Sequence, residues 1–344
     1  QFLYFIASAQ LRLATMPVPV KDATNGHHIG FGKVILFGEH VVVHGAEAVV
    51  AGVSEYTDCT LRVTKGNPGL KVVDNRPAVP GYKVSKREEQ KLAHDLVLKH
   101  HKIDLSKDGL EATIGGPLVP SSGIGASASD VVALSRALNE LYNLKLNEDQ
   151  INHSAFVGEG GYHGTPSGVD NTAATFGGLL TYQKTASGPK FTKMPCKTPL
   201  YLVVVSTGIT ASTTKVVGEV RAMKEKDPEF FAAIMRDYQA VLDDAKKAIA
   251  EGDVERLGEL LNKNHAICQR LTVSCDELEA IVNTARHGGA LGAKMSGTGR
   301  GGIAVALCRD ELSQASVAAK LKAHCPEAKF VWQYAVKPSV ASRL

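Results

Sequence analysis

A loop rich in glycine and serine is the first candidate for chemistry, because a helical pattern follows it at once. It covers residues 120–129 and has the sequence Pro-Ser-Ser-Gly-Ile-Gly-Ala-Ser-Ala-Ser. Glycines let backbone N–H groups approach a polyanion, and the first helical turn offers unpaired N–H donors at the positive end of its dipole. The segment predicts a phosphate-binding loop, with a flexible connector as the alternative.

This loop differs from two well-known phosphate-binding patterns. It lacks the Gly-Lys-Ser/Thr ending of a Walker A loop and the third glycine of a dinucleotide fingerprint. No short parallel-strand unit surrounds it. An oxidoreductase with a dinucleotide fold is therefore disfavoured.

Three further segments gather charged residues, histidines or glycines. They lie at residues 31–40, 158–171 and 294–302, and the last is a second glycine-rich turn. Their candidate chemical residues are Lys33, Glu39, His40, Glu159, His163 and Asp170. Taken singly, each segment also has an ordinary explanation, such as surface charge, partly buried histidine, a helix cap or a hairpin.

The elements that must position these residues follow from the spacing of apolar side chains. The predicted strands are 34–37, 48–53, 57–64, 109–114, 177–183, 200–206, 290–295, 303–307 and 329–336. The predicted helices are 85–101, 127–144, 147–158 (with Asn147 as N-cap), 212–226, 228–251, 254–271, 275–287 and 311–324. Strands and helices without a regular βαβ rhythm predict an α+β fold, and the polar stretch 185–199 predicts a domain boundary.

Composition narrows the functional classes. The chain has 344 residues, 44% of them hydrophobic, and a net charge of +4, which suits an anionic small substrate but argues against nucleic acid. Its six cysteines form no C-x-x-C pair, so free thiols without structural zinc are expected. No apolar run approaches the roughly 18 residues that span a membrane, so no membrane partner is expected.

The two ends of the chain carry separate expectations. Residues 1–15 precede Met16 and are expected to be a tag or leader outside the fold. The final tripeptide, Ser342-Arg343-Leu344, resembles the signal read by the peroxisomal import receptor, with Arg in place of Lys. It predicts a peroxisome-type, glycosome-like location; the alternative is a cytoplasmic protein with an ordinary tail.

Together and in this order, the four segments resemble the GHMP kinase superfamily, over about residues 30–336. The tract Gly38-Glu39-His40 with Val43-His44-Gly45 resembles its mevalonate kinase branch, as does the tract from His163 to Asn171. The resemblance implies a two-domain α+β fold with the active site in the interdomain cleft. Residues 16–190 would form a ribosomal S5 domain 2-like part and residues 191–344 a ferredoxin-like part.

The resemblance also implies a reaction and its participants. ATP with Mg²⁺ would be the phosphoryl donor, and the 5-hydroxyl of mevalonate the acceptor, as a step of isoprenoid biosynthesis. Asp170 matches the catalytic base and Lys33 the cation paired with it. An adjacent cation keeps a carboxylate ionised and can draw a proton from the acceptor hydroxyl.

Other roles follow from the same matches. Ser127 and Glu159 match the magnesium ligands, whose hard oxygens suit this cation. The residues that match the ATP-binding loop are Pro120, Ser121, Ser122, Gly123, Ile124, Gly125, Ala126, Ser127 and Ala128. Those that match positions near the acceptor are Glu39, His40, His163 and Thr213. The match at Thr213 rests on the short tract 212–215.

One departure and several alternatives accompany this interpretation. Arg300 interrupts the late glycine run, so glycine-like backbone freedom is not expected there; its side chain would contact phosphate, a neighbouring acid or solvent. A kinase for another small alcohol, such as phosphomevalonate, galactose or homoserine, is the nearest alternative. A catalytically silent sensor is disfavoured because Lys33, Ser127, Glu159 and Asp170 are all present. A homodimer is left open.

Overall fold

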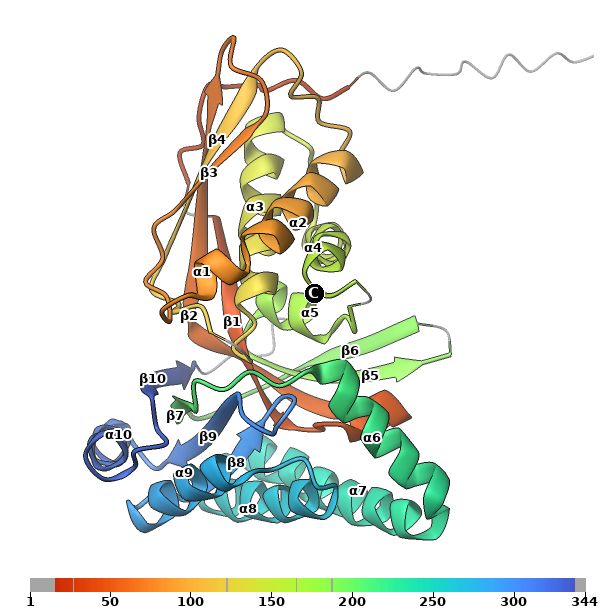
Figure 1. The fold of residues 1–344 in the computed structure, drawn as a ribbon, viewed down its shortest axis with the longest axis vertical. Coiled ribbons are helices and arrows are strands. Elements are labelled where there is room, and N and C mark those ends of the chain that lie inside the picture. Colours follow the sequence, from red (N-terminus) through yellow and green to blue (C-terminus); the bar gives the residue numbers. More distant parts are fainter. Residues whose placement is uncertain (1–15, 27, 122, 165, 187, 338–344) are drawn as a thin grey trace, which may run out of the picture.

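Two β-sheets, one in each half of the chain, organise the molecule (Figure 1). The computed structural model describes residues 16–26, 28–121, 123–164, 166–186 and 188–337. Residues 1–15, Ser122 and the terminal Ser342-Arg343-Leu344 lie outside this range, so the expectations for them stay predictions. No helix in the described part of the chain is long and apolar enough to cross a membrane.

The first sheet belongs to the N-terminal unit and has the order β3-β4-β2-β5-β6, with β1 paired to β2. Its strands are β1 (His28–Phe37), β2 (Ala48–Thr64), β3 (Leu70–Asp74), β4 (Gly109–Gly115), β5 (Leu179–Thr185) and β6 (Gly188–Met194). The pair β3–β4 is parallel, and the other pairs are antiparallel. β2 is a single strand where two were predicted, and its first part pairs with β5 while its last part pairs with β4.

Helices cover one face of this sheet (Figure 1). They are α1 (Tyr82–Ser85), α2 (Arg87–His100), α3 (Ala126–Tyr142), α4 (Glu148–His163) and α5 (Val169–Phe176), and a short 3₁₀ helix spans Val41–His44. In α3 the apolar residues predicted at helical spacing, Val131, Leu134, Leu138 and Leu141, are all buried. The side chain of Asn147 caps α4 as predicted, but the helix continues through Glu159 to His163.

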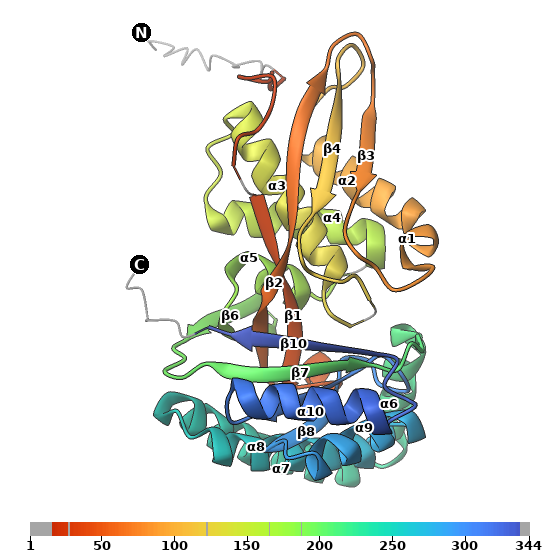
Figure 2. The same ribbon diagram turned by 90° about the vertical axis from the view of Figure 1, so that its left-hand side faces the viewer.

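The second sheet has the order β10-β7-β9-β8 and is antiparallel throughout. Its strands are β7 (Leu200–Ser206), β8 (Gly292–Ser296), β9 (Ile303–Cys308) and β10 (Phe330–Val336). The helices of this unit are α6 (Thr213–Lys226), α7 (Pro228–Glu251), α8 (Val254–Arg270), α9 (Asp276–His287) and α10 (Glu311–His324). Helices α7, α8 and α9 lie beneath the sheet in Figure 2, and the chain is the expected α+β fold.

The stretch 185–199, predicted to contain the domain boundary, includes β6. This strand pairs with β5 in the N-terminal sheet, so a boundary at residues 190/191 divides a strand. The change of sheet falls between Met194 and Leu200, and we place the boundary there. The polar composition of β6 reflects its position at the edge of the sheet, with most of its side chains exposed or half-buried.

The two units pack directly against each other. One cluster of buried apolar residues includes Val34 and Phe37 of β1 together with Leu202 of β7 and Val305 of β9. The hydroxyl of Ser296 on β8 accepts a hydrogen bond from the N–H of Ile35 and donates one to its carbonyl, at 3.1 and 2.9 Å. The C-terminal end of β1 is therefore packed against and hydrogen-bonded to the C-terminal unit.

Candidate active site

The glycine–serine loop ends in a tight turn against β1. Gly125 has a φ of 72° and precedes α3, and no described side chain caps the N-terminus of this helix. The Ile124 carbonyl accepts a 2.8 Å hydrogen bond from the N–H of Lys33. A Cβ at residue 125 would lie 2.7 Å from Cγ of Lys33, so only glycine fits. The first turn of α3 thus presents free N–H donors beside Lys33, which is the arrangement that binds anions.

Lys33 and Asp170, far apart in the chain, form an ion pair with 3.1 Å between Nζ and Oδ1. Lys33 lies on β1 with 5% of its surface exposed, whereas the side chain of Asp170 is 29% exposed, in the first turn of α5. The next residue, Asn171, donates a 2.6 Å hydrogen bond to Oδ1 of Asn152 on α4. This anchor, which the sequence analysis missed, fixes the start of α5 and hence the position of Asp170.

Glu159 is a buried carboxylate with unused hydrogen-bonding capacity. Its Oε1 has no hydrogen-bond partner among the described residues, and Nε2 of His163 lies 3.7 Å from Oε2. Burial, and next the Asp170 carboxylate, raise the pKa of Glu159 to about 8, although Lys33 opposes the shift. The Ser127 hydroxyl lies 3.2 Å from Nε2 of His163, whose pKa is lowered by burial.

The oxygens of Ser127 and Glu159 are therefore neighbours at one end of α3. The described residues contain no cluster of three His, Cys, Asp or Glu side chains arranged to hold a metal. Mg²⁺ needs few protein ligands, because phosphates and waters complete its shell. One hydroxyl and one unpartnered carboxylate oxygen fit that requirement. All six cysteines are free, as expected.

A buried polar network behind the loop was also not predicted from the sequence. Asp130 on α3 accepts hydrogen bonds from His94 of α2 at 2.9 Å and Tyr162 of α4 at 2.7 Å. Arg76 pairs with Asp74 at 2.7 Å, and its guanidinium lies 3.4 Å from the Ala126 carbonyl. Burial opposes ionisation of Asp130, but His94 and Arg76 together hold its pKa far below the usual range. The network ties three helices together around the first turn of α3.

The predicted acceptor-side residues separate into two groups. His40 is buried, and its Nε2 lies 2.7 Å from the Thr298 carbonyl, while its Nδ1 has no partner among the described residues. The Thr213 hydroxyl lies 2.7 Å from that of Thr298, so the late glycine-rich turn joins both residues. Glu39 instead points into the protein, where Lys294 and Asn264 occupy its two oxygens.

The remaining loop positions take different environments. Ser121 is buried, and its hydroxyl has no partner within the described part of the chain. The carbonyl of Pro120 accepts a 3.3 Å hydrogen bond from Val79. Ser122 lies outside the described residues. Whether these side chains contact a nucleotide stays a prediction.

Arg300 departs from one expectation. Its φ of 50° lies in the left-handed region, so the backbone there does use the conformation that glycine favours, and the expectation to the contrary was wrong. Its guanidinium forms an ion pair with Glu219 of α6 and lies 3.3 Å from the Thr272 carbonyl. Of the three roles considered, contact with a neighbouring acid is the one observed.

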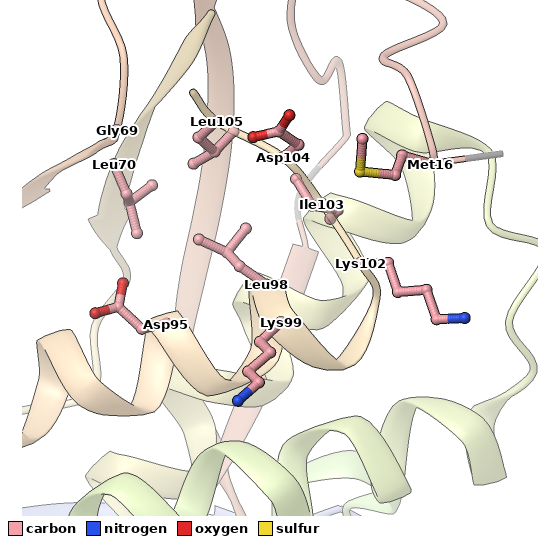
Figure 3. Close-up of a pocket in the computed structure, with 10 residues that line it drawn as sticks. All are labelled: Met16, Gly69, Leu70, Asp95, Leu98, Lys99, Lys102, Ile103, Asp104 and Leu105. Atoms are coloured by element: carbon pink, nitrogen blue, oxygen red, sulfur yellow. The ribbon is translucent and has the colours of Figure 1, made fainter. Parts of the chain in front are cut away.

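A hollow of about 490 Å³ lies in the N-terminal unit, away from these residues (Figure 3). Leu70, Leu98 and Ile103 line it, together with Lys99 and Lys102. None of the predicted site residues contributes to it. The candidate site is instead the junction where β1, α3, α4 and α5 meet the turn after β8.

Comparisons with known proteins agree with this geometry. A family described as GHMP kinases N terminal domain matches residues 90–178, and one described as GHMP kinases C terminal matches residues 245–327. The mevalonate kinase of Thermococcus sibiricus is 32% identical over 313 residues, covering 86% of this chain and 92% of its own.

Solved structures extend the comparison. A crystal structure of L. major mevalonate kinase in complex with R-mevalonate is 60% identical and superimposes with a TM-score of 0.94, covering 95% of this chain and 100% of its own. Lactococcus lactis galactokinase complexed with galactose has a TM-score of 0.68 at 19% identity, covering 93% and 95% of the two chains. This second likeness concerns the fold alone.

Proposed function

The chain belongs to the GHMP kinases, in the mevalonate kinase family, and from that premise we propose that it transfers the terminal phosphoryl group of ATP to the 5-hydroxyl of (R)-mevalonate. The observation that carries the proposal is the Lys33–Asp170 pair beside the uncapped start of α3. It places a carboxylate and a cation next to an anion-binding helix end. Phosphoryl transfer needs little more than such positioning and charge neutralisation.

Each residue of the pair has a defined task. Asp170 accepts the proton of the acceptor hydroxyl as its oxygen bonds to the γ-phosphorus and the bond to ADP breaks. Lys33 forms an ion pair with Asp170 and, being almost fully buried, adds positive charge close to the transferred group. Asn171 holds Asp170 in place through α4.

The phosphates would be held by the backbone. The free N–H groups at 126–128 and the dipole of α3 favour a polyanion at this helix end. The turn at Gly125 brings these donors against Lys33. ATP, the donor implied by the family, supplies a triphosphate that suits this helix end.

Mg²⁺ would be held by Ser127 and Glu159. The support is the buried, unpartnered Oε1 of Glu159 next to a hydroxyl, both hard oxygen donors. When bound, the cation neutralises charge on the phosphate oxygens. The chain's part is to hold these two oxygens in place through α3 and α4.

A substrate panel tests the proposal. Purified protein, ATP and Mg²⁺ are incubated with (R)-mevalonate, phosphomevalonate, galactose or homoserine, and ADP release is followed together with the mass of the product. We expect turnover with mevalonate and a product heavier by one phosphoryl group. Release of ADP with another alcohol but not with mevalonate would overturn the substrate assignment.

A further inference from the structure

We propose that Lys294 is a positioning residue for the acceptor side of the site, acting through Glu39 on the turn that carries His40. The proposal rests on the proposed function, because it takes the His40 side of the junction as the place where the acceptor binds. It gives Glu39 a role different from the substrate contact that the sequence suggested.

The pair Glu39–Lys294 is a fully buried ion pair between the two units. Both side chains have 0% exposure. The Nζ of Lys294 donates to Oε1 of Glu39 and to the carbonyl of Met295, and the amide of Asn264 donates to Oε2 of Glu39 at 3.2 Å. With both carboxylate oxygens occupied, Glu39 has little left to offer a substrate.

The turn that Glu39 belongs to needs external support. His40, the next residue, has a φ of 61°, a conformation that is costly for a residue other than glycine. Within the turn, the N–H of Val41 reaches the Glu39 carbonyl at 2.7 Å and that of Val42 the Gly38 carbonyl at 3.0 Å. Such local bonds do not select the strained conformation alone, so contacts from outside the turn must hold it.

Among the described residues, the polar contacts that Glu39 and His40 receive come from β8 and the turn that follows it, apart from that of Asn264. Ser296 forms hydrogen bonds with the backbone of Ile35, and Lys294 forms the ion pair with Glu39. The Thr298 carbonyl forms a hydrogen bond with the ring of His40. Residues 294, 296 and 298 thus contact β1 and the turn that follows it at three places. Lys33, the partner of Asp170, lies on the same strand. β8 therefore sets the distance between the phosphoryl-transfer pair and His40.

A buried ion pair is a poor way to gain stability alone, because desolvating two charges offsets their attraction. Apolar residues of similar volume would fill this space about as well. A charged pair differs because its hydrogen bonds are directional. The ammonium of Lys294 and the amide of Asn264 each bind one oxygen of Glu39 and so fix the position of its carboxylate. The retained charges are thus explained by positioning.

The test compares wild-type protein with Lys294→Met and with the double variant Lys294→Met/Glu39→Leu. The single variant leaves a buried carboxylate unpaired and is expected to lower the unfolding midpoint. The double variant removes both charges and should recover the midpoint, yet lose about tenfold to a hundredfold in kcat/KM for mevalonate, since small displacements near reacting groups cost that much. KM for ATP should stay within about twofold, because its site lies at α3.

A second measurement does not depend on activity. Amide hydrogen exchange in a peptide covering residues 36–44 should be about tenfold faster or more in the double variant. Lys246→Met is the matched control, because it breaks another ion pair between the units, the 2.6 Å contact of Lys246 with Glu47, without touching His40. It should leave kcat/KM and this exchange unchanged.

The outcomes separate the two proposals. A double variant with wild-type kcat/KM and wild-type exchange at residues 36–44 overturns the positioning role. If the double variant does not fold, Asn264→Leu decides, since it frees one oxygen of Glu39 and should speed exchange of the same peptide; unchanged exchange overturns the role. Wild-type protein that turns over another alcohol but not mevalonate overturns the proposed function, and the exchange result still stands.

Discussion

The phosphoryl-transfer side and the acceptor-side turn differ in how fully their acidic side chains are hydrogen-bonded. At the first, Glu159 keeps an oxygen without a partner among the described residues, and Asp170 is nearly a third exposed. At the second, Glu39 has both oxygens bonded and no exposure. Unsatisfied polar groups indicate where a ligand must bind, and saturated ones where the protein holds itself in shape.

Asp170→Asn probes the first side most strongly. Loss of the base should lower kcat by about a hundredfold to ten-thousandfold, while nucleotide still binds at α3. Steady-state kinetics and nucleotide titration measure the two quantities, and a melting curve checks that Lys33, left without its partner, does not unfold the protein. Near-normal turnover would show that Asp170 is not the base.

Lys294→Met probes the second side. Removing one member of a buried pair strands the other, so the unfolding free energy should fall by about 3–5 kcal/mol. Denaturant unfolding measures it. For Lys246→Met, whose lysine and glutamate are 38% and 26% exposed, a loss of only about 0–1 kcal/mol is expected. Equal losses in both variants would remove the distinction between the two kinds of pair.

Glu159→Gln tests whether the unpartnered oxygen serves a cation. The variant keeps the shape of the side chain but replaces one oxygen by an NH₂ group and can no longer ionise when a cation binds, so half-saturating Mg²⁺ should rise by about tenfold or more. Activity is measured against Mg²⁺ concentration at fixed ATP, with Glu47→Gln, an acid outside the site, as the control. The same Mg²⁺ dependence in both variants would contradict the assignment.

His265, which contacts β8 beside the saturated pair, gives an effect that depends on pH. Its Nδ1 accepts a hydrogen bond from the N–H of Met295 on β8, and burial lowers its pKa well below the usual 6.5. Below pH 6.5 the unfolded chain takes up a proton at His265 while the folded protein does not. The contribution of this residue to the unfolding free energy is therefore complete above pH 6.5 and is lost as the pH falls. His265→Asn should flatten the decline of unfolding free energy on acidification; an unchanged decline would reject its involvement.

Local patterns predicted local structure well. The strand Leu200–Ser206 and the helix Glu311–His324 lie where they were expected, because regular apolar spacing marks both. α5 was missed, since a short helix after a glycine-rich tract has little periodicity. β6 was not predicted, because an edge strand can be polar and its stretch was assigned to the domain boundary.

The site divides in the same way. The loop before α3 could be predicted from its own residues, and Lys33 and Asp170 from a family resemblance. The bond between Glu39 and Lys294 spans 255 positions, and nothing local marks a lysine that will be fully buried. The anchor of Asn171 on Asn152 depends likewise on how α4 and α5 pack.

The shared apolar cluster has a consequence for folding. β1 contributes to the same buried cluster as β7, β9 and α7, so part of the interior is shared between the two units. Chains of this kind lose their structure in one cooperative step, whereas loosely tethered domains melt separately. Calorimetry should accordingly give one heat-absorption peak, and a fragment ending near Met194 should not remain folded.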